Sequence, residues 1–272
     1  MYLSRHRTAG GPRWALDGRY LPEDFALTRL SEIPAAEATD ALGDLRAGDS
    51  AEQDPLLPPV EPYQEVWAGG VTYERSREAR ELESADADAY ARVYGADRPE
   101  LFFKAHGWRA VGHGDTVRVR KDSSWNVPEP ELVLVLNSRM EVLGYTAGND
   151  VSSRDIEGEN PLYLPQAKIY DGSCALGPGI VLAGPDGMRD LPIRLRISRD
   201  DRVAFEGEVS TSRMKRSFEE LAEYLGRELT LPSGAFLMTG TGVVPGEEFT
   251  LTPGDRVEVS VGELVLENDV AG

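Results

Sequence analysis

Apolar and polar positions alternate along two stretches in the second half of the chain, and a third stretch is apolar throughout. Apolar residues occupy every second position over 193–197 and again over 257–261, with charged or polar residues between them. Residues 132–136 (LVLVL) form the continuous apolar run. Strict alternation predicts a strand with one buried face, and a short continuous run predicts a strand inside the core. We therefore expect mostly β structure from Leu101 onward.

A helical period interrupts this β pattern. Ser217 and Glu220 fit the capping box that marks the start of a helix. The apolar residues that follow recur at spacings of three or four, at Phe218, Leu221, Leu225 and Leu229. This pattern predicts a helix with one buried face over 217–229. A second helix, on the surface, is predicted over 74–94, which is rich in Glu, Arg and Ala.

The first quarter of the chain has weaker signals. Residues 14–18 (WALDG) look like part of a hairpin, and a short element is expected over 21–31. A proline-dense stretch follows at 55–62 (PLLPPVEP), which is typical of a linker. We therefore predict a small N-terminal domain with its linker over 1–62 and a larger catalytic domain over 63–272.

Composition limits the classes of partner. The 272 residues include 47 acidic and 29 basic ones, a formal net charge of -18, which opposes binding to nucleic acid or anionic membranes. No apolar run approaches the roughly 20 residues of a membrane helix, and residues 1–10 lack an apolar signal core. The one cysteine, Cys174, is expected to pack as a small apolar residue in a cytoplasmic protein. An anionic substrate then needs local positive charge from a metal ion or from converging Lys and Arg residues.

The first candidate chemistry is a pair of glutamates at the start of the apolar run. Glu129 and Glu131 are two residues apart, so in an extended chain they share a face at a spacing of roughly 6.6 Å. Pro130 between them donates no ladder hydrogen bond, which places the pair at a strand start or a bulge. Two buried carboxylates need a shared proton or a cation such as a hard metal ion. An exposed acidic strand end is the alternative.

A second acidic cluster follows at 144–155 (GYTAGNDVSSRD). On residue types alone, Asp150 or Ser152 could cap a helix there. The cluster stands in an ordered series of motifs: Glu-x-Glu at 129–131, Asn-Asp-x-Ser-x-Arg-Asp at 149–155, Lys168 before Leu-Gly-Pro at 176–178, and Thr-Gly-Thr-Gly-Val-Val-Pro-Gly at 239–246. With this series the chain resembles the fumarylacetoacetate hydrolase family from about Val66 to Val270.

This resemblance implies an α+β fold that is mainly β, a mixed β-roll catalytic domain. It implies that Glu129, Glu131 and Asp150 are ligands of Mg²⁺, with Mn²⁺ or Ca²⁺ as other choices. Three carboxylates on an octahedral ion leave roughly three positions, enough for a small 2-oxo acid to chelate through its carboxylate and keto oxygens. The ion would stabilise the enolate that forms when a C3 proton leaves. The resemblance also suggests a homodimer or homotetramer.

One further residue, Lys168, matches a lysine that lies beside the substrate in this family, and three others are candidates for contact with the substrate. Lys168 is expected to be catalytic, holding an oxyanion or moving a proton. Arg154 and Gln166 are expected to bind the substrate, with bracing of their loop as the alternative. Thr241 lies in a Gly-rich turn and offers a hydroxyl and an N–H to a carboxylate, although such a turn is by itself only a loop signal.

One segment departs from the hydrolytic members of the family. These commonly carry Gly-Leu-Asn-Tyr-x-x-His-x-x-Glu, whose His and Glu activate the attacking water. Aligned on Tyr73, this chain has Ser76 in place of the His and Ala79 in place of the Glu. Its histidines, His6, His106 and His113, lie elsewhere. Hydrolysis is therefore disfavoured, whereas a β-elimination needs no activated water.

One branch of the family, the dehydratases of 2-keto-3-deoxy sugar acids, is more similar. The shared segments are 98–105 (RPELFFKA) and 159–168 (ENPLYLPQAK). The resemblance implies a lyase that converts an acid such as 2-dehydro-3-deoxy-D-arabinonate into 2-oxoglutarate semialdehyde, with Glu100 as a catalytic acid or base beside Lys168. The alternatives are a hydrolase, decarboxylase or isomerase with the same metal site, and a non-catalytic protein that binds a metabolite.

Overall fold

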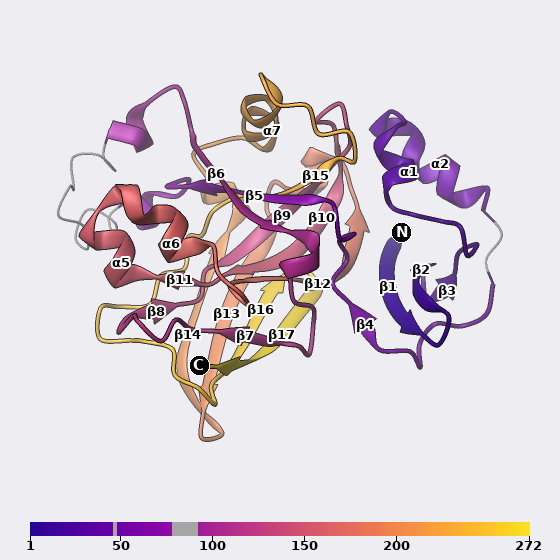
Figure 1. Ribbon diagram of the computed structural model, residues 1–272. Helices are drawn as coiled ribbons and strands as arrows, with labels where there is room; N and C mark the ends of the chain where they lie inside the picture. The colour runs from indigo at the N-terminus through magenta and orange to yellow at the C-terminus, as the bar shows by residue number, and fades with distance from the viewer. Residues whose placement is uncertain (46–47, 78–91) are drawn as a thin grey trace.

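Two β-sheets contain most of the strands of the protein (Figure 1). The computed structural model describes residues 1–45, 48–77 and 92–272. Apolar side chains from both sheets form one core between them. The prediction of an α+β fold that is mainly β is confirmed.

The larger sheet has ten strands in the order β3-β2-β1-β12-β10-β9-β15-β5-β6, with β4 paired to β1. Neighbouring strands are antiparallel except for β15 and β5, which are parallel. The strands are β1 (Tyr2–Thr8), β2 (Gly11–Leu16), β3 (Arg19–Tyr20), β4 (Leu56–Leu57), β5 (Glu65–Gly70), β6 (Glu100–His106), β9 (Pro130–Leu136), β10 (Val142–Asp150), β12 (Cys174–Leu182) and β15 (Ala235–Met238).

The second sheet has five strands in the order β14-β13-β16-β17-β7. They are β7 (Thr116–Arg118), β13 (Pro192–Arg199), β14 (Arg202–Ser210), β16 (Arg256–Val261) and β17 (Leu264–Ala271). The two predicted alternating stretches are β13 and β16, which pair antiparallel with their apolar side chains facing the larger sheet. A separate two-stranded sheet pairs β8 (Asn126–Val127) with β11 (Ser152–Ser153).

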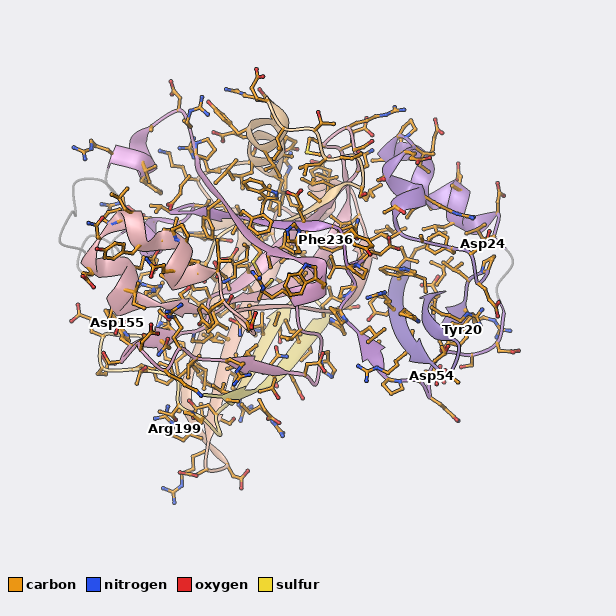
Figure 2. The ribbon with its side chains drawn as sticks, viewed as in Figure 1. Tyr20, Asp24, Asp54, Asp155, Arg199 and Phe236 are labelled. Carbon is orange, nitrogen blue, oxygen red and sulfur yellow. The ribbon has the colours of Figure 1, made fainter. Side chains whose placement is uncertain are left out.

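Strand β9 explains why 132–136 is apolar throughout. All seven of its residues are buried. Leu132, Leu134 and Leu136 face the core between the sheets. Val133 and Val135 face a second core on the other side, together with Phe236 of β15, which lies near the centre of the molecule (Figure 2). A strand with both faces buried has no position for an alternating polar residue.

The predicted amphipathic helix is α7 (Phe218–Gly226). The Ser217 side chain accepts a hydrogen bond from the Glu220 N–H at 3.1 Å, as the capping box predicts. The Glu220 carboxylate pairs with Arg216 at 2.6 Å. The helix ends before Leu229, which is partly exposed, so the prediction was three residues too long.

The surface helix predicted over 74–94 is only partly within the described residues. The chain is helical at 74–77 and 92–95, and 78–91 lie outside the described part. The other α-helices are short, namely α1 (Thr28–Ser31), α2 (Ala38–Gly43), α5 (Arg154–Glu159) and α6 (Leu164–Lys168). Among the described residues, no helix has the length and apolar character that a membrane crossing requires.

The N-terminal segment joins the larger sheet. Strands β2 and β3 form the predicted hairpin, and β1 pairs with both β2 and β12. The proline-dense segment at 55–62 packs closely, because its Leu56 and Leu57 form β4 and its Val60 is fully buried. Next to it, the Tyr20 hydroxyl donates to Asp54 at 2.5 Å (Figure 2). The boundary predicted at residue 62 stays a prediction.

Candidate active site

The three predicted metal ligands meet where β9 begins and β10 ends. These strands are antiparallel neighbours, and Gly148 lies opposite Glu131, so the two strand ends place Glu129, Glu131 and Asp150 side by side. One carboxylate oxygen from each lies within 4.8 Å of the others, and all three residues are buried. The spacing of the glutamates and the antiparallel register therefore create one acidic centre.

The local backbone fixes this meeting point. Strand β9 begins at Pro130, as its missing N–H predicts. The Asp150 N–H donates to the Glu129 carbonyl at 2.9 Å, and the Glu129 N–H donates to Asn149 Oδ1 at 3.2 Å. Asp150 ends a strand and Ser152 lies in β11, so neither caps a helix, and that alternative is wrong. Helix α5 begins two residues after Ser152, at Arg154.

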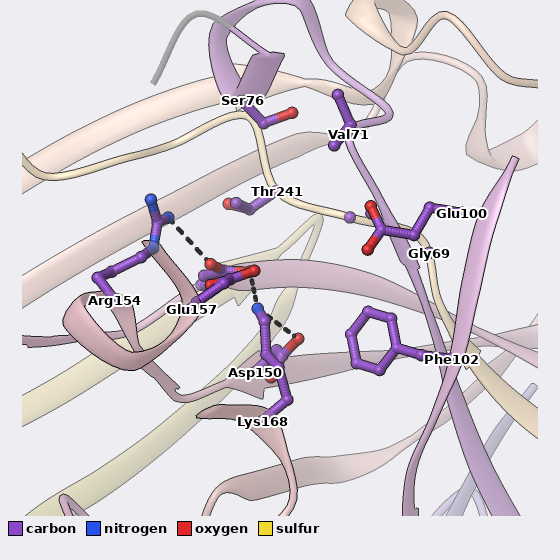
Figure 3. Close-up of a pocket in the computed structure, with 13 residues that line it drawn as sticks. Gly69, Val71, Ser76, Glu100, Phe102, Asp150, Arg154, Glu157, Lys168 and Thr241 are labelled. Carbon is purple, nitrogen blue, oxygen red and sulfur yellow. Dashed lines mark hydrogen bonds and ion pairs between the residues drawn. The ribbon is translucent and has the colours of Figure 1, made fainter. Parts of the chain in front are cut away.

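Two cations from the following segment contact the acidic centre (Figure 3). Lys168 Nζ lies 2.8 Å from Glu129 Oε2, 3.1 Å from Asp150 Oδ2 and 2.6 Å from Ser152 Oγ. Arg154 Nη2 donates to Glu129 Oε1 at 2.9 Å. Buried carboxylates need such partners, because an unpaired buried charge costs several kcal/mol. Lys168 therefore contacts two of the proposed metal ligands directly.

Glu131 is held from a different side. The Gly240 N–H donates to Glu131 Oε2 at 2.6 Å. Gly240 has φ +90°, and a Cβ at this position would lie 2.1 Å from Thr72 Oγ1, so only glycine fits this approach. Burial raises the pKa of Glu131 well above its usual value, and the nearby charges of Asp150 and Glu129 raise it further. A bound cation would stabilise the ionised form of Glu131 against both its burial and the neighbouring negative charges.

The donor set fits a hard divalent ion. Its three ligands are carboxylates, and oxygen ligands suit Mg²⁺, Mn²⁺ and Ca²⁺ rather than softer metals. The single cysteine is fully buried behind the site, in β12 opposite Asp150, and burial raises the pKa of its thiol to about 12. Cys174 therefore packs as an apolar side chain, as predicted.

A pocket opens over the acidic centre (Figure 3). Its lining includes Glu129, Asp150, Arg154, Glu157, Lys168, Ser76, Glu100, Phe102 and Thr241. The ring of Phe102 lies beside Lys168, with Nζ 5.8 Å from its centroid. One wall thus combines an apolar ring with a cation, and the floor is acidic. This arrangement suits a small anion that chelates an ion on the floor.

Four of the five catalytic and substrate-binding predictions fall on the pocket lining, namely Glu100, Arg154, Lys168 and Thr241. The Glu100 carboxylate lies directly against Gly70, its partner in β5. A Cβ at Gly70 would be 2.1 Å from this carboxylate, so glycine makes room for it. The Thr241 hydroxyl donates to the Val243 carbonyl at 3.1 Å within its own turn.

The structure does not bring Gln166 into the pocket. Its side chain is exposed on α6, and its carbonyl accepts a hydrogen bond from Arg120 at 3.0 Å. Residues two apart in a helix point in different directions, so Gln166 cannot share the face of Lys168. Its role in substrate binding stays a prediction that the geometry does not support.

The segment that differs from the hydrolytic relatives lies at the pocket. Ser76, at the position of the hydrolytic His, lines the pocket and donates to the Tyr73 carbonyl at 2.8 Å. Ala79 lies outside the described residues. Among the described lining residues there is no histidine. This part of the site thus offers a short hydroxyl in place of an imidazole base.

Three residues at or beside the site were missed by the sequence reasoning. Phe102 and Glu157 line the pocket, and Lys104 is fully buried with its Nζ 2.5 Å from Asp150 Oδ1. A signal for two of them was present. Phe102 stands two residues after Glu100 and shares its face, and Lys104 stands among the apolar residues Phe102, Phe103 and Ala105, where a lysine needs a buried partner.

The sheets and the acidic site together define the class of this protein. The chain belongs to the fumarylacetoacetate hydrolase family, because the family described as "Fumarylacetoacetate (FAA) hydrolase C-terminal" matches residues 66–271. The resemblance and the β-roll fold that it implied are thereby confirmed.

Two curated relatives are dehydratases by name. A probable 2-keto-3-deoxyxylonate dehydratase of Haloferax volcanii is 51% identical over 211 residues, which cover 76% of this chain and 72% of the relative. A 2-dehydro-3-deoxy-D-arabinonate dehydratase of Saccharolobus solfataricus is 47% identical over 216 residues, covering 77% of this chain and 72% of the relative.

A solved structure is similar to this chain over nearly its whole length. It is a 2-keto-3-deoxy-D-arabinonate dehydratase complexed with magnesium and 2,5-dioxopentanoate, with a TM-score of 0.85 and 38% identity. The match covers 99% of this chain and 98% of that one.

Proposed function

We propose that this protein is a Mg²⁺-dependent hydro-lyase that removes water from a 2-keto-3-deoxy sugar acid, such as 2-dehydro-3-deoxy-D-arabinonate. The observation that carries the proposal is the buried set of Glu129, Glu131 and Asp150 with Lys168 directly beside it. Support comes from the dehydratase relatives and from the similar dehydratase that binds magnesium and 2,5-dioxopentanoate. That compound is the semialdehyde which loss of water from the five-carbon acid produces.

The proposed reaction divides the work between the ion and the side chains. Mg²⁺ held by the three carboxylates would supply Lewis-acid polarisation of the C2 carbonyl, worth several kcal/mol. Lys168, whose Nζ contacts Glu129 and Asp150, is the group that we propose takes the C3 proton. Glu100, which lines the pocket from β6, is proposed to protonate the departing C4 hydroxyl, which leaves as water.

Two proton shifts then remain. Loss of the C3 proton and the C4 hydroxyl leaves a double bond between C3 and C4 and an alcohol at C5. Moving a proton from C5 to C3 gives an enol, which becomes the aldehyde when the proton of its hydroxyl moves to C4. After the first step Glu100 is a carboxylate and Lys168 is an ammonium group, so Glu100 is proposed to take the C5 proton and Lys168 to return a proton to C3, which restores both groups to their starting states.

Metal dependence tests the proposal. Exhaustive treatment with EDTA should stop turnover, and Mg²⁺ or Mn²⁺ should restore it, whereas Zn²⁺ should restore it poorly, because an all-oxygen site suits hard octahedral ions. The measurement is formation of the semialdehyde from the five-carbon acid, followed by a coupled aldehyde dehydrogenase. Full activity of the chelated protein would contradict the proposal.

The role of Glu100 is tested by Glu100→Gln, which keeps the shape of the side chain and removes its acid. We expect kcat to fall by about 100-fold or more, since a positioned acid or base contributes roughly 10² to 10⁴. Binding of Mg²⁺ in calorimetry should stay as in the wild type, because Glu100 is not among the three ligands. Glu208→Gln, an exposed change on β14, is the control. Wild-type kcat in Glu100→Gln would remove Glu100 from the mechanism.

We also propose that the enzyme is a cytoplasmic homodimer or homotetramer. The family resemblance and the exposed apolar side chains of Tyr63, Trp108 and Leu162 support self-association, and the single cysteine is in keeping with a reducing compartment. Sedimentation velocity of the purified protein would give the number of subunits, and a monomer at micromolar concentration would contradict this part of the proposal.

A further inference from the structure

Lys104 is a fully buried lysine that does not line the pocket. It lies in β6 two residues after Phe102, where the pairing of β6 with β5 shifts by one residue. A buried ammonium group needs partners for its charge and for its three N–H donors. The contacts of Lys104 therefore indicate its role.

The Lys104 ammonium contacts two parts of the active site at once. Its Nζ lies 2.5 Å from Asp150 Oδ1, 2.5 Å from the main-chain carbonyl of Lys168 and 3.3 Å from that of Val151. The two carbonyls accept hydrogen bonds from the ammonium group, and the Asp150 carboxylate forms an ion pair with it. Asp150 is a proposed metal ligand, and Lys168 carries the proposed catalytic amine.

The contact with Asp150 gives the carboxylate one orientation. Its Oδ1 is held by Lys104, while its Oδ2 lies 3.1 Å from Lys168 Nζ at the pocket floor. The two oxygens of Asp150 thus contact different lysines, one outside the pocket lining and one within it. Without Lys104, rotation of this side chain would no longer be restrained by an ion pair.

The contact with the Lys168 carbonyl holds the C-terminal end of α6. Lys168 ends α6, a helix of five residues, and the last carbonyls of a helix have no partner within the helix. Lys104 Nζ and the Ser173 hydroxyl, the latter at 2.9 Å, both donate to this carbonyl. They hold the main chain from which the Lys168 side chain extends toward Glu129 and Asp150.

We infer that Lys104 is a positioning residue that sets the distance between the metal ligand Asp150 and the catalytic Lys168. The inference rests on the proposed function for the roles of these two residues. It differs from simple charge compensation, in which Lys104 only neutralises the negative charge of Asp150 and a bound Mg²⁺ would do so equally well. Positioning predicts a defect that remains when the ion is saturating.

The test uses Lys104→Met, which keeps the length of the side chain and removes the ammonium, with the exposed Lys121→Met as control. At saturating Mg²⁺ we expect kcat to fall by about 100-fold, the cost of a misplacement of about 1 Å, with KM changed far less. In the metal-free protein, amide hydrogen exchange in 164–173 should become roughly tenfold faster, as expected for the loss of one charge-assisted hydrogen bond. Exchange in β13 should not change.

Two results would overturn the inference. One is a wild-type kcat for Lys104→Met at saturating Mg²⁺, which would reduce Lys104 to charge compensation. The other is unchanged exchange in 164–173, which would show that Lys104 does not hold the main chain of Lys168. The exchange experiment uses neither ion nor substrate, so it separates failure of this inference from failure of the proposed dehydratase activity.

Ser173→Ala decides the question if Lys104→Met does not fold. It removes the second donor to the Lys168 carbonyl, leaves Asp150 untouched and deletes only one hydroxyl. We expect a severalfold lower kcat at saturating Mg²⁺, faster exchange in 164–173 and an unchanged dissociation constant for Mg²⁺. Faster exchange in 164–173 together with a wild-type kcat would overturn the inference, because the main chain of Lys168 would then be loosened at no catalytic cost.

Discussion

Asp150→Asn and Glu129→Gln should each abolish measurable dehydration and weaken Mg²⁺ binding by more than about 100-fold. Each substitution keeps the size of the side chain and removes one of three negative charges whose oxygens lie within 4.8 Å of one another. Loss of a group that only supports a metal ligand typically costs 10- to 100-fold in affinity, so loss of a charged ligand should cost more. Isothermal calorimetry of the metal-free proteins measures the change directly.

The two variants should differ in the folded state without metal. In Asp150→Asn, Lys104 and Lys168 both lose a buried carboxylate partner, whereas in Glu129→Gln the loss falls on Lys168 and Arg154. Thermal unfolding of the metal-free proteins reports this cost, because a buried charge that loses its partner is strongly destabilising. Asp186→Asn, an exposed substitution far from the pocket lining, is the control for loss of one carboxylate. Wild-type affinity for Mg²⁺ in a folded Asp150→Asn or Glu129→Gln protein would show that the ligand assignment is wrong.

The spacing of apolar residues correctly predicted strands with one buried face or with both faces buried. The alternating stretches at 193–197 and 257–261 are strands with one face toward the core, and the apolar run at 132–136 is buried on both faces. The end of α7 was placed too late, because Leu229 continues the apolar period although the chain has already left the helix. Apolar spacing does not show where backbone hydrogen bonding stops.

The acidic centre could be predicted because it depends on local spacing and on one strand pairing. Glu129 and Glu131 share a face, and the antiparallel register brings Asp150 beside them. Lys104 was missed because its partners, Asp150 and the Lys168 carbonyl, are 46 and 64 residues away. The sequence around Lys104 does not show which distant groups it contacts. Gln166 was predicted to bind the substrate or to brace its loop, but it stands two residues before Lys168 in a helical turn, which directs the two side chains apart.

The choice between lyase and hydrolase depends on the wall of the pocket rather than on its acidic floor. Every reaction considered for this family begins with a 2-oxo acid chelated over carboxylates, so the triad alone cannot separate them. Ser76 occupies the position of the hydrolytic base, and its hydroxyl is already used in a hydrogen bond to the Tyr73 carbonyl. A serine hydroxyl does not activate water at neutral pH unless a base lies beside it. This wall therefore favours elimination over hydrolysis, and Lys168 and Glu100 line the same pocket.

The protein should therefore dehydrate 2-keto-3-deoxy acids with a C4 hydroxyl and be nearly inert toward acylpyruvates of similar size. Dehydration of the five-carbon acid yields a semialdehyde that a coupled dehydrogenase reports, whereas hydrolysis of an acylpyruvate yields pyruvate and a carboxylic acid. Lys168→Met should lower kcat for dehydration by about 100-fold or more, the usual contribution of a positioned proton-transfer group. Its affinity for Mg²⁺ should change far less, since the amine works on the substrate, and a mutation that lowers kcat without weakening ground-state binding marks a group used in the transition state. If the wild-type protein cleaves acylpyruvates faster than it dehydrates any 2-keto-3-deoxy acid, the inference from Ser76 fails, and the same carboxylates and lysine must serve a hydrolase whose water is activated by a different group.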